Sequence, residues 1–496
     1  MAPNLSLLPL PENRFDRACA RHLLWRVGFG GTPEEVNELA ALGREKAVKR
    51  LVDYASGPAA QPPALEIDPD ILRVPTPQEQ QRYKKARRSG DQDFLDARRR
   101  AGLAARRQDR KVFGKLKAWW FARIVQTPRP AEERLVLLWH GHFASSYRSV
   151  RDAYLMQVQN EFFRRHASGS FADLARGIVR DPAMLKYLNN NQNNKKKPNE
   201  NLARELMELF TLGVGRYTEQ DIKQGARALT GYTFTDNDFV FRDNNHDDGI
   251  KKILGRTGNF DGDSFVELLL RQEACSKFVA LKLYDHFVAD VGDVYEAVPG
   301  PQRRVIDLMA KRLRRDNYRL KPVLTQLFSS QHFYDASVIG KKIKDPVQLV
   351  VGTVRALGAP VRDERVIDKA MHSMGQKLFE PPTVDGWDGG RLWINTSTLF
   401  VRQNVTTYLL SGKRPDKKKN IPHNIYDPQA LIAGLEDRSA AAVVDHLIDH
   451  AVGPHVPSAR REPLHRFFQE RGGPTHNPNL VALLCLITAM PEYQLC

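Results

Sequence analysis

The stretch NENLARELMELFTLG, residues 199–213, carries leucines at positions 202, 206, 209 and 212. Intervals of three and four residues return to the same side of a helix that advances about 100° per residue. The stretch therefore predicts a helix whose leucine stripe faces a core.

Helix-start signals recur on both sides of this stretch. Thr32 precedes Pro33 and two glutamates, Pro130 precedes Ala131 and two glutamates, and Ser170 precedes another apolar run. A hydroxyl at the N-cap, proline in the first turn and early acids are typical helix starts. Alternating strand patterns are sparse, and Tyr232–Phe241 is the best candidate for a hairpin or extended segment. The chain is predicted to be mainly α.

Three biased segments divide the chain of 496 residues, which exceeds the usual size of one core. Gln61–Gln80 is rich in proline, Asn189–Asn199 in asparagine and lysine, and Ser411–Asn420 in charge. We expect a large multi-helix domain over residues 1–410, a linker over 411–420 and a small helical C-terminal subdomain over 421–496.

Positive charge is concentrated in one block. The formal net charge is +17, and Arg82–Arg123 alone holds fifteen lysines and arginines against four aspartates. So dense a block predicts a projecting, peripheral helical arm. The arm is either a solvated helix or a surface for a polyanion, so its candidate partners are an acidic protein, a glycan or another polyanion.

Several features restrict the class of protein. No apolar run approaches the roughly 20 residues of a membrane helix, so no span is expected. Met1–Pro11 lacks the basic and apolar parts of a secretory signal, which indicates a cytoplasmic protein. The four cysteines show no C-x-x-C spacing, so we expect reduced thiols.

Glu205 lies inside the leucine stripe of residues 199–213, and Glu208 lies at its rim. We expect Glu205 to be buried, and a buried carboxylate needs a partner. That partner is a metal, an arginine or a second acid. An ordinary structural pair with Arg204 or Arg227 explains the pattern equally well.

Two other segments carry metal-ligating side chains. His140 and His142 face opposite ways if their helix continues, and share one side if the chain becomes extended after Gly141. His246 and Asp247 occupy a polar loop. Imidazole and carboxylate groups suit zinc, iron or copper, although helix-end histidines and ordinary turns explain the same residues.

Two residues are candidate substrate contacts. Trp387 lies in a turn-rich segment, residues 381–393, that forms either a stacking shelf for a sugar or a packed loop. Arg204 precedes Glu205 and offers a cation beside the predicted acidic site.

Taken in order, several motifs resemble the successive signatures of the bacterial family catalogued as domain of unknown function 1800, over roughly residues 17–404. They are Arg21-His22-Leu23-Leu24, Gly28-Phe29-Gly30, Trp139-His140-Gly141-His142-Phe143, Asp181-Pro182-Ala183-Met184-Leu185, Asn199-Glu200, residues 203–213, Ala228-Leu229-Thr230-Gly231, His246-Asp247, Pro381-Pro382 and Gly386-Trp387. The family pattern has Asn where this chain has Gly141. Many members carry export signals, so the resemblance leaves export open. It implies no reaction.

The leading hypothesis is a metal-dependent hydrolase. His140, His142 and His246 would bind a divalent metal, while Glu205, Glu208 and Asp247 would supply acid and base groups to a metal-activated water. One alternative is a non-catalytic partner or scaffold protein whose buried polar groups fix its packing. Another is a polyanion or glycan binder that uses the basic arm with Trp119, Trp120 or Trp387.

Overall fold

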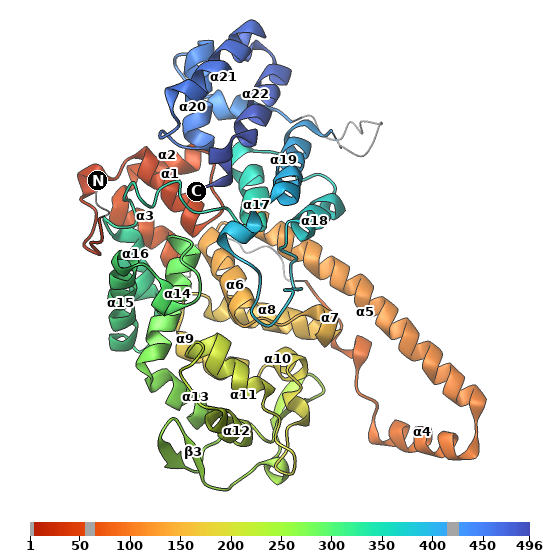
Figure 1. Cartoon of the computed structure of the whole chain (residues 1–496). Coiled ribbons are helices and arrows are strands. Elements are labelled where there is room, and N and C mark those ends of the chain that lie inside the picture. Colours follow the sequence, from red (N-terminus) through yellow and green to blue (C-terminus); the bar gives the residue numbers. More distant parts are fainter. Residues whose placement is uncertain (1–3, 55–64, 414–425) are drawn as a thin grey trace.

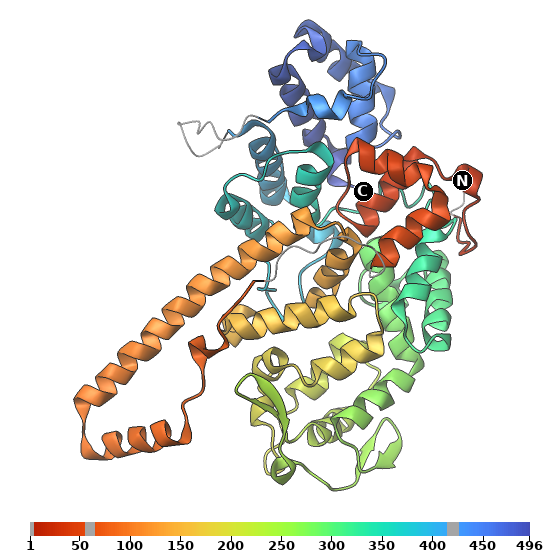
Figure 2. The same cartoon turned by 180° about the vertical axis from the view of Figure 1, so that it is seen from behind.

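The computed structural model describes residues 4–54, 65–413 and 426–496. The prediction of a mainly α protein is confirmed, because helices make up almost the whole elongated body (Figures 1 and 2). The α-helices are α1 (Arg17–Val27), α2 (Pro33–Ala41), α3 (Gly43–Val52), α4 (Pro77–Ser89), α5 (Gln92–Gln126), α6 (Pro130–His142), α7 (Tyr147–Val150), α8 (Ala153–His166), α9 (Phe171–Ile178), α10 (Pro182–Tyr187), α11 (Asn201–Glu205), α12 (Glu219–Ala228), α13 (Gly262–Arg271), α14 (Glu273–Phe287), α15 (Gly300–Arg315), α16 (Leu320–Ser329), α17 (Pro346–Leu357), α18 (Glu364–Ser373), α19 (Thr396–Ser411), α20 (Ala440–Ala451), α21 (Ser458–Glu470) and α22 (Asn477–Ala489).

Side-chain hydrogen bonds cap the helices at two of the predicted helix starts. Thr32 and Glu35 form a reciprocal capping box at the start of α2, and Ser170 accepts a hydrogen bond from the amide of Ala172 in α9. These bonds satisfy amides that have no partner inside the helix. Pro130 occupies the first turn of α6, where its missing N–H costs nothing.

Two small antiparallel hairpins accompany the helices. The predicted extended segment forms β1 (Tyr232–Thr235) and β2 (Asp238–Phe241), with Tyr232 opposite Phe241. A second hairpin, β3 (Lys251–Ile253) and β4 (Arg256–Gly258), was not predicted. Strands of three residues are too short for an alternating pattern to be recognised.

The helix predicted from residues 199–213 changes its geometry halfway. α11 ends at Glu205 and continues as the π-helix η5 (Leu206–Thr211). A π-helix turns less per residue than an α-helix, so the stripe drawn at about 100° per residue does not hold. The predicted burial of Glu205 is therefore wrong: Glu205 and Leu209 are half-buried, while Met207 and Phe210 are buried.

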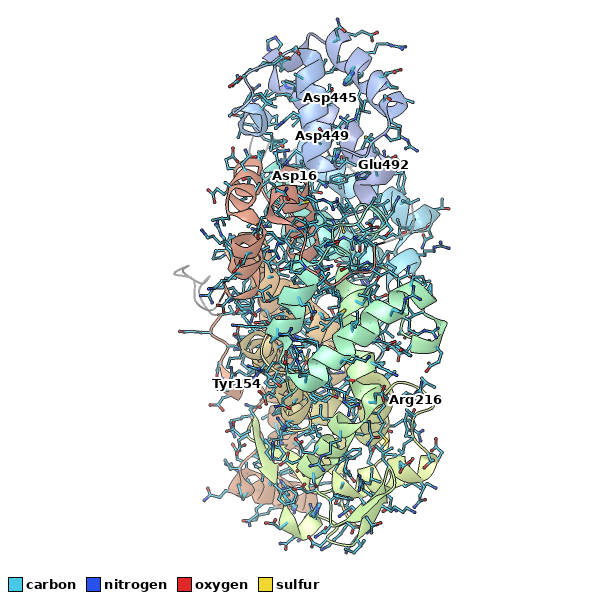
Figure 3. All side chains as sticks on the ribbon, turned by 90° about the vertical axis from the view of Figure 1, so that its left-hand side faces the viewer. Asp16, Tyr154, Arg216, Asp445, Asp449 and Glu492 are labelled. Atoms are coloured by element: carbon cyan, nitrogen blue, oxygen red, sulfur yellow. The ribbon has the colours of Figure 1, made fainter. Side chains whose placement is uncertain are left out.

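The C-terminal helices pack on the body through one hydrophobic core that extends from Leu7 to Tyr493. α22 contacts α19, and Arg402 in α19 donates a hydrogen bond to Gln494. Asp445 and Asp449 project from α20 (Figure 3), and Arg461 of α21 binds both. Of the predicted linker, residues 414–420 lie outside the described residues.

The basic block occupies α4 and α5, which project from the body as one arm that bends at Gly90 (Figures 1 and 2). The base of α5 is anchored by Glu133, which is fully buried in α6. Its carboxylate accepts hydrogen bonds from Trp120, Arg123 and Arg164. The arm is thus attached through a buried ionic cluster and points into solvent beyond it.

None of the described helices combines the length and the apolar character that crossing a membrane requires.

Candidate functional site

A polar cavity lies where α6, η5 and α14 meet the loop of residues 381–393. Its volume is about 170 Å³. A second cavity of about 240 Å³ adjoins it, because Leu209, Lys282 and Asp293 line both. We call the two cavities together the cleft. Its walls come from segments that are hundreds of residues apart in sequence.

The loop of residues 381–393 is seated directly on the C-terminal turn of α6. Gly386 has a φ of +95°, and any Cβ there would collide with the carbonyl oxygen of Gly141. Trp387 then lies over Gly141, where an added Cβ would be 3.4 Å from the indole ring. Glycine at position 386 permits this close approach, whereas a Cβ on residue 141 would make only an ordinary contact. The His140-Gly141-His142 and Gly386-Trp387 motifs are therefore in contact.

The inner wall of the cleft contains cations that are already neutralised. Arg134 binds Asp345, and Lys342 binds Asp290. Both cationic side chains are almost fully buried, and their carboxylate partners are partly exposed. Paired charges of this kind stabilise the wall and are poorly available to a ligand.

Other charged groups of the cleft are uncommitted. Lys282, Asp293, Asp385 and Asp388 line it, and none of them forms a hydrogen bond or ion pair with another described residue. The Lys282 ammonium is held only over the ring of Phe278, at 5.2 Å. Uncommitted charges gathered at a cavity are available to a ligand or a reacting group.

Glu205 stands beside the rim of the cleft rather than in its wall. Burial, together with the neighbouring carboxylates of Glu208 and Asp385, raises the pKa of Glu205 to about 7. Its carboxyl group has no hydrogen-bond partner in the described part of the chain. Glu208 lines the second cavity and accepts a short hydrogen bond from the Tyr217 hydroxyl. We call Glu205, Glu208 and Asp385 the carboxylate cluster, because the negative charges of Glu208 and Asp385 both disfavour ionisation of Glu205.

His142 lines the cleft, but its ring is buried and neutral. Its Nε2 lies 2.9 Å from the carbonyl oxygen of Phe210, so in the neutral ring Nε2 carries the proton and donates. Nδ1 then keeps a lone pair and has no partner among the described residues. Burial, reinforced by the Lys282 charge, lowers the pKa of His142 to about 3, so the ring is neutral.

His140 points away from His142 because α6 continues through both residues. Its fully buried ring is enclosed by four aromatic side chains, those of Trp120, Phe163, Phe379 and Trp387. Neither ring nitrogen has a hydrogen-bond partner in the described structure, and burial lowers the pKa to about 3. His140 is therefore a neutral ring within an aromatic cage.

His246 and Asp247 make structural contacts elsewhere, beside the hairpins. Nδ1 of His246 lies 2.8 Å from the carbonyl oxygen of Thr230. Asp247 accepts two hydrogen bonds from Arg227, which hold the pKa of Asp247 down at about 2. These bonds attach the loop before β3 to α12, so Asp247 is an ionised anchor rather than a base.

Arg204, the other predicted substrate contact, is similarly engaged. Its guanidinium donates to both carboxylate oxygens of Glu219 and to Glu200. Within the described residues, no three or more His, Cys, Asp or Glu side chains form a group that could hold a metal ion. The six predicted residues thus do not converge, and the divalent metal stays an untested prediction.

Sequence reasoning overlooked Lys282, Asp385 and Asp388. The two aspartates flank Trp387 in the turn-rich segment already noticed, so a search for acids beside that tryptophan would have found them. Lys282 lies on an ordinary helix, and no local signal distinguishes it.

The fold and cleft define a mainly helical protein with a charged cleft beneath a tryptophan-bearing loop. The chain belongs to the family described as Protein of unknown function (DUF1800), whose model matches residues 22–495. No curated protein and no solved structure matches it.

Proposed function

We propose that this protein is a hydrolase that uses the carboxylate cluster beside the cleft for general acid–base catalysis. Glu205 would protonate the leaving-group oxygen, and Asp385 would activate the attacking water. The observation that carries the proposal is the meeting of acids from two distant segments, η5 with α11 and the loop of residues 381–393, at a cleft that contains several uncommitted charges.

Different environments divide the acid and base roles. Glu205 is half-buried beside two other acids and keeps its proton near neutral pH, whereas Asp385 is exposed to solvent. Carboxyl groups in contrasting environments are the usual arrangement for one acid and one base. A positioned acid or base typically contributes a factor of about 100 to 10,000 in rate.

A glycosidic bond is the substrate class that best matches these groups. Glycoside hydrolysis uses two carboxyl groups, one on each side of the reacting bond. Trp387 is half-buried over the helix end and lines the cavity, where a flat indole face suits a sugar ring.

The test is a panel of p-nitrophenyl glycosides, with p-nitrophenyl acetate and p-nitrophenyl phosphate as other bond classes. We expect turnover of a glycoside, reduced by at least about 100-fold in Asp385→Asn. The p-nitrophenolate group leaves without a proton, so Glu205→Gln is tested on the methyl glycoside of the same sugar, where we expect a loss of at least about 100-fold. Glu219→Gln is the matched control, because Glu219 is exposed and its carboxylate binds Arg204 outside the cleft. Full activity in Glu205→Gln would refute the proposed acid.

Chelation separates this proposal from the metal-dependent hydrolase predicted from the sequence. Activity that survives dialysis against a chelator supports the carboxylate mechanism. Loss of activity on chelation, restored by a divalent metal, would assign the reaction to metal-activated water instead.

A further inference from the structure

The arm presents an unusual density of exposed cations. Twelve basic side chains on α4 and α5 are exposed: Arg82, Lys84, Lys85, Arg87, Arg88, Arg99, Arg100, Arg106, Arg107, Arg110, Lys111 and Lys115. None of them forms an ion pair with a described residue, in contrast to Lys117 at the arm's base, which binds Asp368. The arm therefore carries positive charge that the protein itself does not neutralise.

Six of these cations form an ordered surface on α5. They are three adjacent doublets, at residues 99 and 100, 106 and 107, and 110 and 111. Steps of seven and four residues return to the same side of a helix, so the doublets line one face. From first to last they span about 18 Å at 1.5 Å per residue, which is about five base pairs of a duplex.

No ion pair with an aspartate of the arm neutralises the positive charge of this face. Asp109 is buried and accepts hydrogen bonds from the Tyr147 hydroxyl and the Ala153 amide. Asp91 caps the start of α5 through the Phe94 amide. Asp93 and Asp96 lie between the bend and the doublets. Asp96 is three and four residues before Arg99 and Arg100, on the same side of α5, but no ion pair joins it to either arginine.

The arm lacks the features that other polyanion ligands require. Its ring faces are occupied, because Arg98 stacks on Tyr83 at 4.4 Å and Arg82 on Phe94 at 4.9 Å. Single-stranded nucleic acid relies on open aromatic faces for base stacking. Between residues 77 and 123, Leu103 is the one large apolar side chain that is exposed, so no apolar face is available for membrane insertion.

We propose that the arm binds double-stranded nucleic acid through its phosphates, without reading the base sequence. Eight of the twelve exposed cations are arginines, whose planar guanidinium suits bidentate contact with phosphate. An α-helix with its side chains is about 10–12 Å wide, comparable with the roughly 12 Å major groove. The arm projects from the body (Figures 1 and 2), and all six side chains of the doublets are exposed.

The binding surface is independent of the cleft, so this inference does not depend on the proposed hydrolysis. The experiment uses the full chain and a fluorescent duplex of about 30 base pairs. Anisotropy is measured between about 50 and 200 mM NaCl, with two unrelated duplex sequences. If the six cations of the α5 face each contact a phosphate, the logarithm of the association constant falls with the logarithm of the NaCl concentration with a slope of about −5. Both duplex sequences then bind equally tightly.

The arm variant Arg99→Gln/Arg106→Gln/Arg110→Gln removes one cation from each doublet. We expect the salt slope to become shallower by about 3 and the affinity at low salt to fall at least about tenfold. The variant Arg99→Lys/Arg106→Lys/Arg110→Lys keeps the positive charge and should retain most of the salt dependence of binding. Arg304→Gln/Lys311→Gln/Arg314→Gln on α15 is the matched control, because it removes three exposed cations elsewhere.

Unchanged circular dichroism melting of both glutamine variants checks that the fold is intact. The proposal is overturned if wild-type protein does not bind the duplex at low salt, or if the arm and α15 variants lose affinity equally. Tighter binding to a single strand, to heparin or to phosphatidylserine vesicles than to the duplex would also overturn it and assign the surface to that ligand.

Discussion

Gly386 and Gly141 lie backbone to backbone, and the carbonyl oxygen of Gly141 occupies the space that a side chain on Gly386 would need. This contact seats the loop of residues 381–393 on the end of α6. It therefore sets the position of Trp387 over the cleft and brings Asp385 beside Glu205.

Gly386→Ala should destabilise the protein by about 1–3 kcal/mol, because alanine is strained at a φ of +95° and its Cβ meets the Gly141 carbonyl. Denaturant unfolding measures the loss, and Trp387 fluorescence should shift as the loop lifts. Gly389→Ala is the control in the same loop, since nothing lies within 4 Å of its added Cβ. Equal losses of stability in the two variants would contradict the role of the Gly386–Gly141 contact in holding the loop.

Glu205→Gln should make stability depend less on pH. The pKa of Glu205 is raised to about 7 in the folded protein from a model-peptide value of 4.5. Folded protein thus binds this proton more tightly, so stability falls as pH rises from 4.5 to about 7. Glutamine avoids that loss, and the variant should be more stable than wild type at pH 8 by on the order of 1 kcal/mol after solvent screening, with no difference at pH 4.

Thermal melts of both proteins across this pH range test the sign. Glu219→Gln should behave in the opposite way, because Arg204 lowers the pKa of Glu219 and its carboxylate favours the folded state when ionised. A Glu205→Gln variant that is less stable than wild type at pH 8 would rule out an uncompensated acid at this position.

His140→Phe should preserve or raise stability, because phenylalanine keeps an aromatic ring in the cage and removes two ring nitrogens that lack partners in the described structure. Elemental analysis should find the same metal content in variant and wild type. His142→Phe is the comparison, and it should cost about 1 kcal/mol through loss of the hydrogen bond to Phe210. If the wild type holds a stoichiometric metal that His140→Phe lacks, His140 is a metal ligand after all.

Glu133→Gln should cost roughly 3 kcal/mol, since it leaves two arginines beside a neutral group in the buried cluster at the base of the arm. Urea unfolding measures the change. Glu161→Gln is the control, because Glu161 binds the same Arg164 from a partly exposed position and should cost less than about 1 kcal/mol. Similar costs for the two variants would show that burial does not govern the cluster.

Local signals in the sequence correctly predicted several elements. The N-cap at Thr32, the proline start of α6 and the Tyr232–Phe241 hairpin all appear in the structure. They were predictable because capping bonds and short hairpins join residues a few positions apart. The prediction that Glu205 is buried failed because it extended a regular helix through a segment where the backbone becomes a π-helix.

The sequence by itself determined the helical class, the family and the dense positive charge of residues 82–123, since composition, periodicity and motif order are properties of the chain. Only the tertiary structure decided which polar groups are available. Asp247 is bound by Arg227 and Arg204 by Glu219, whereas Asp385 and Lys282 are uncommitted at the cleft. Charged side chains pair with whichever groups the fold brings near them. The cleft joins segments near residues 141, 209, 282 and 385, which no local sequence pattern relates.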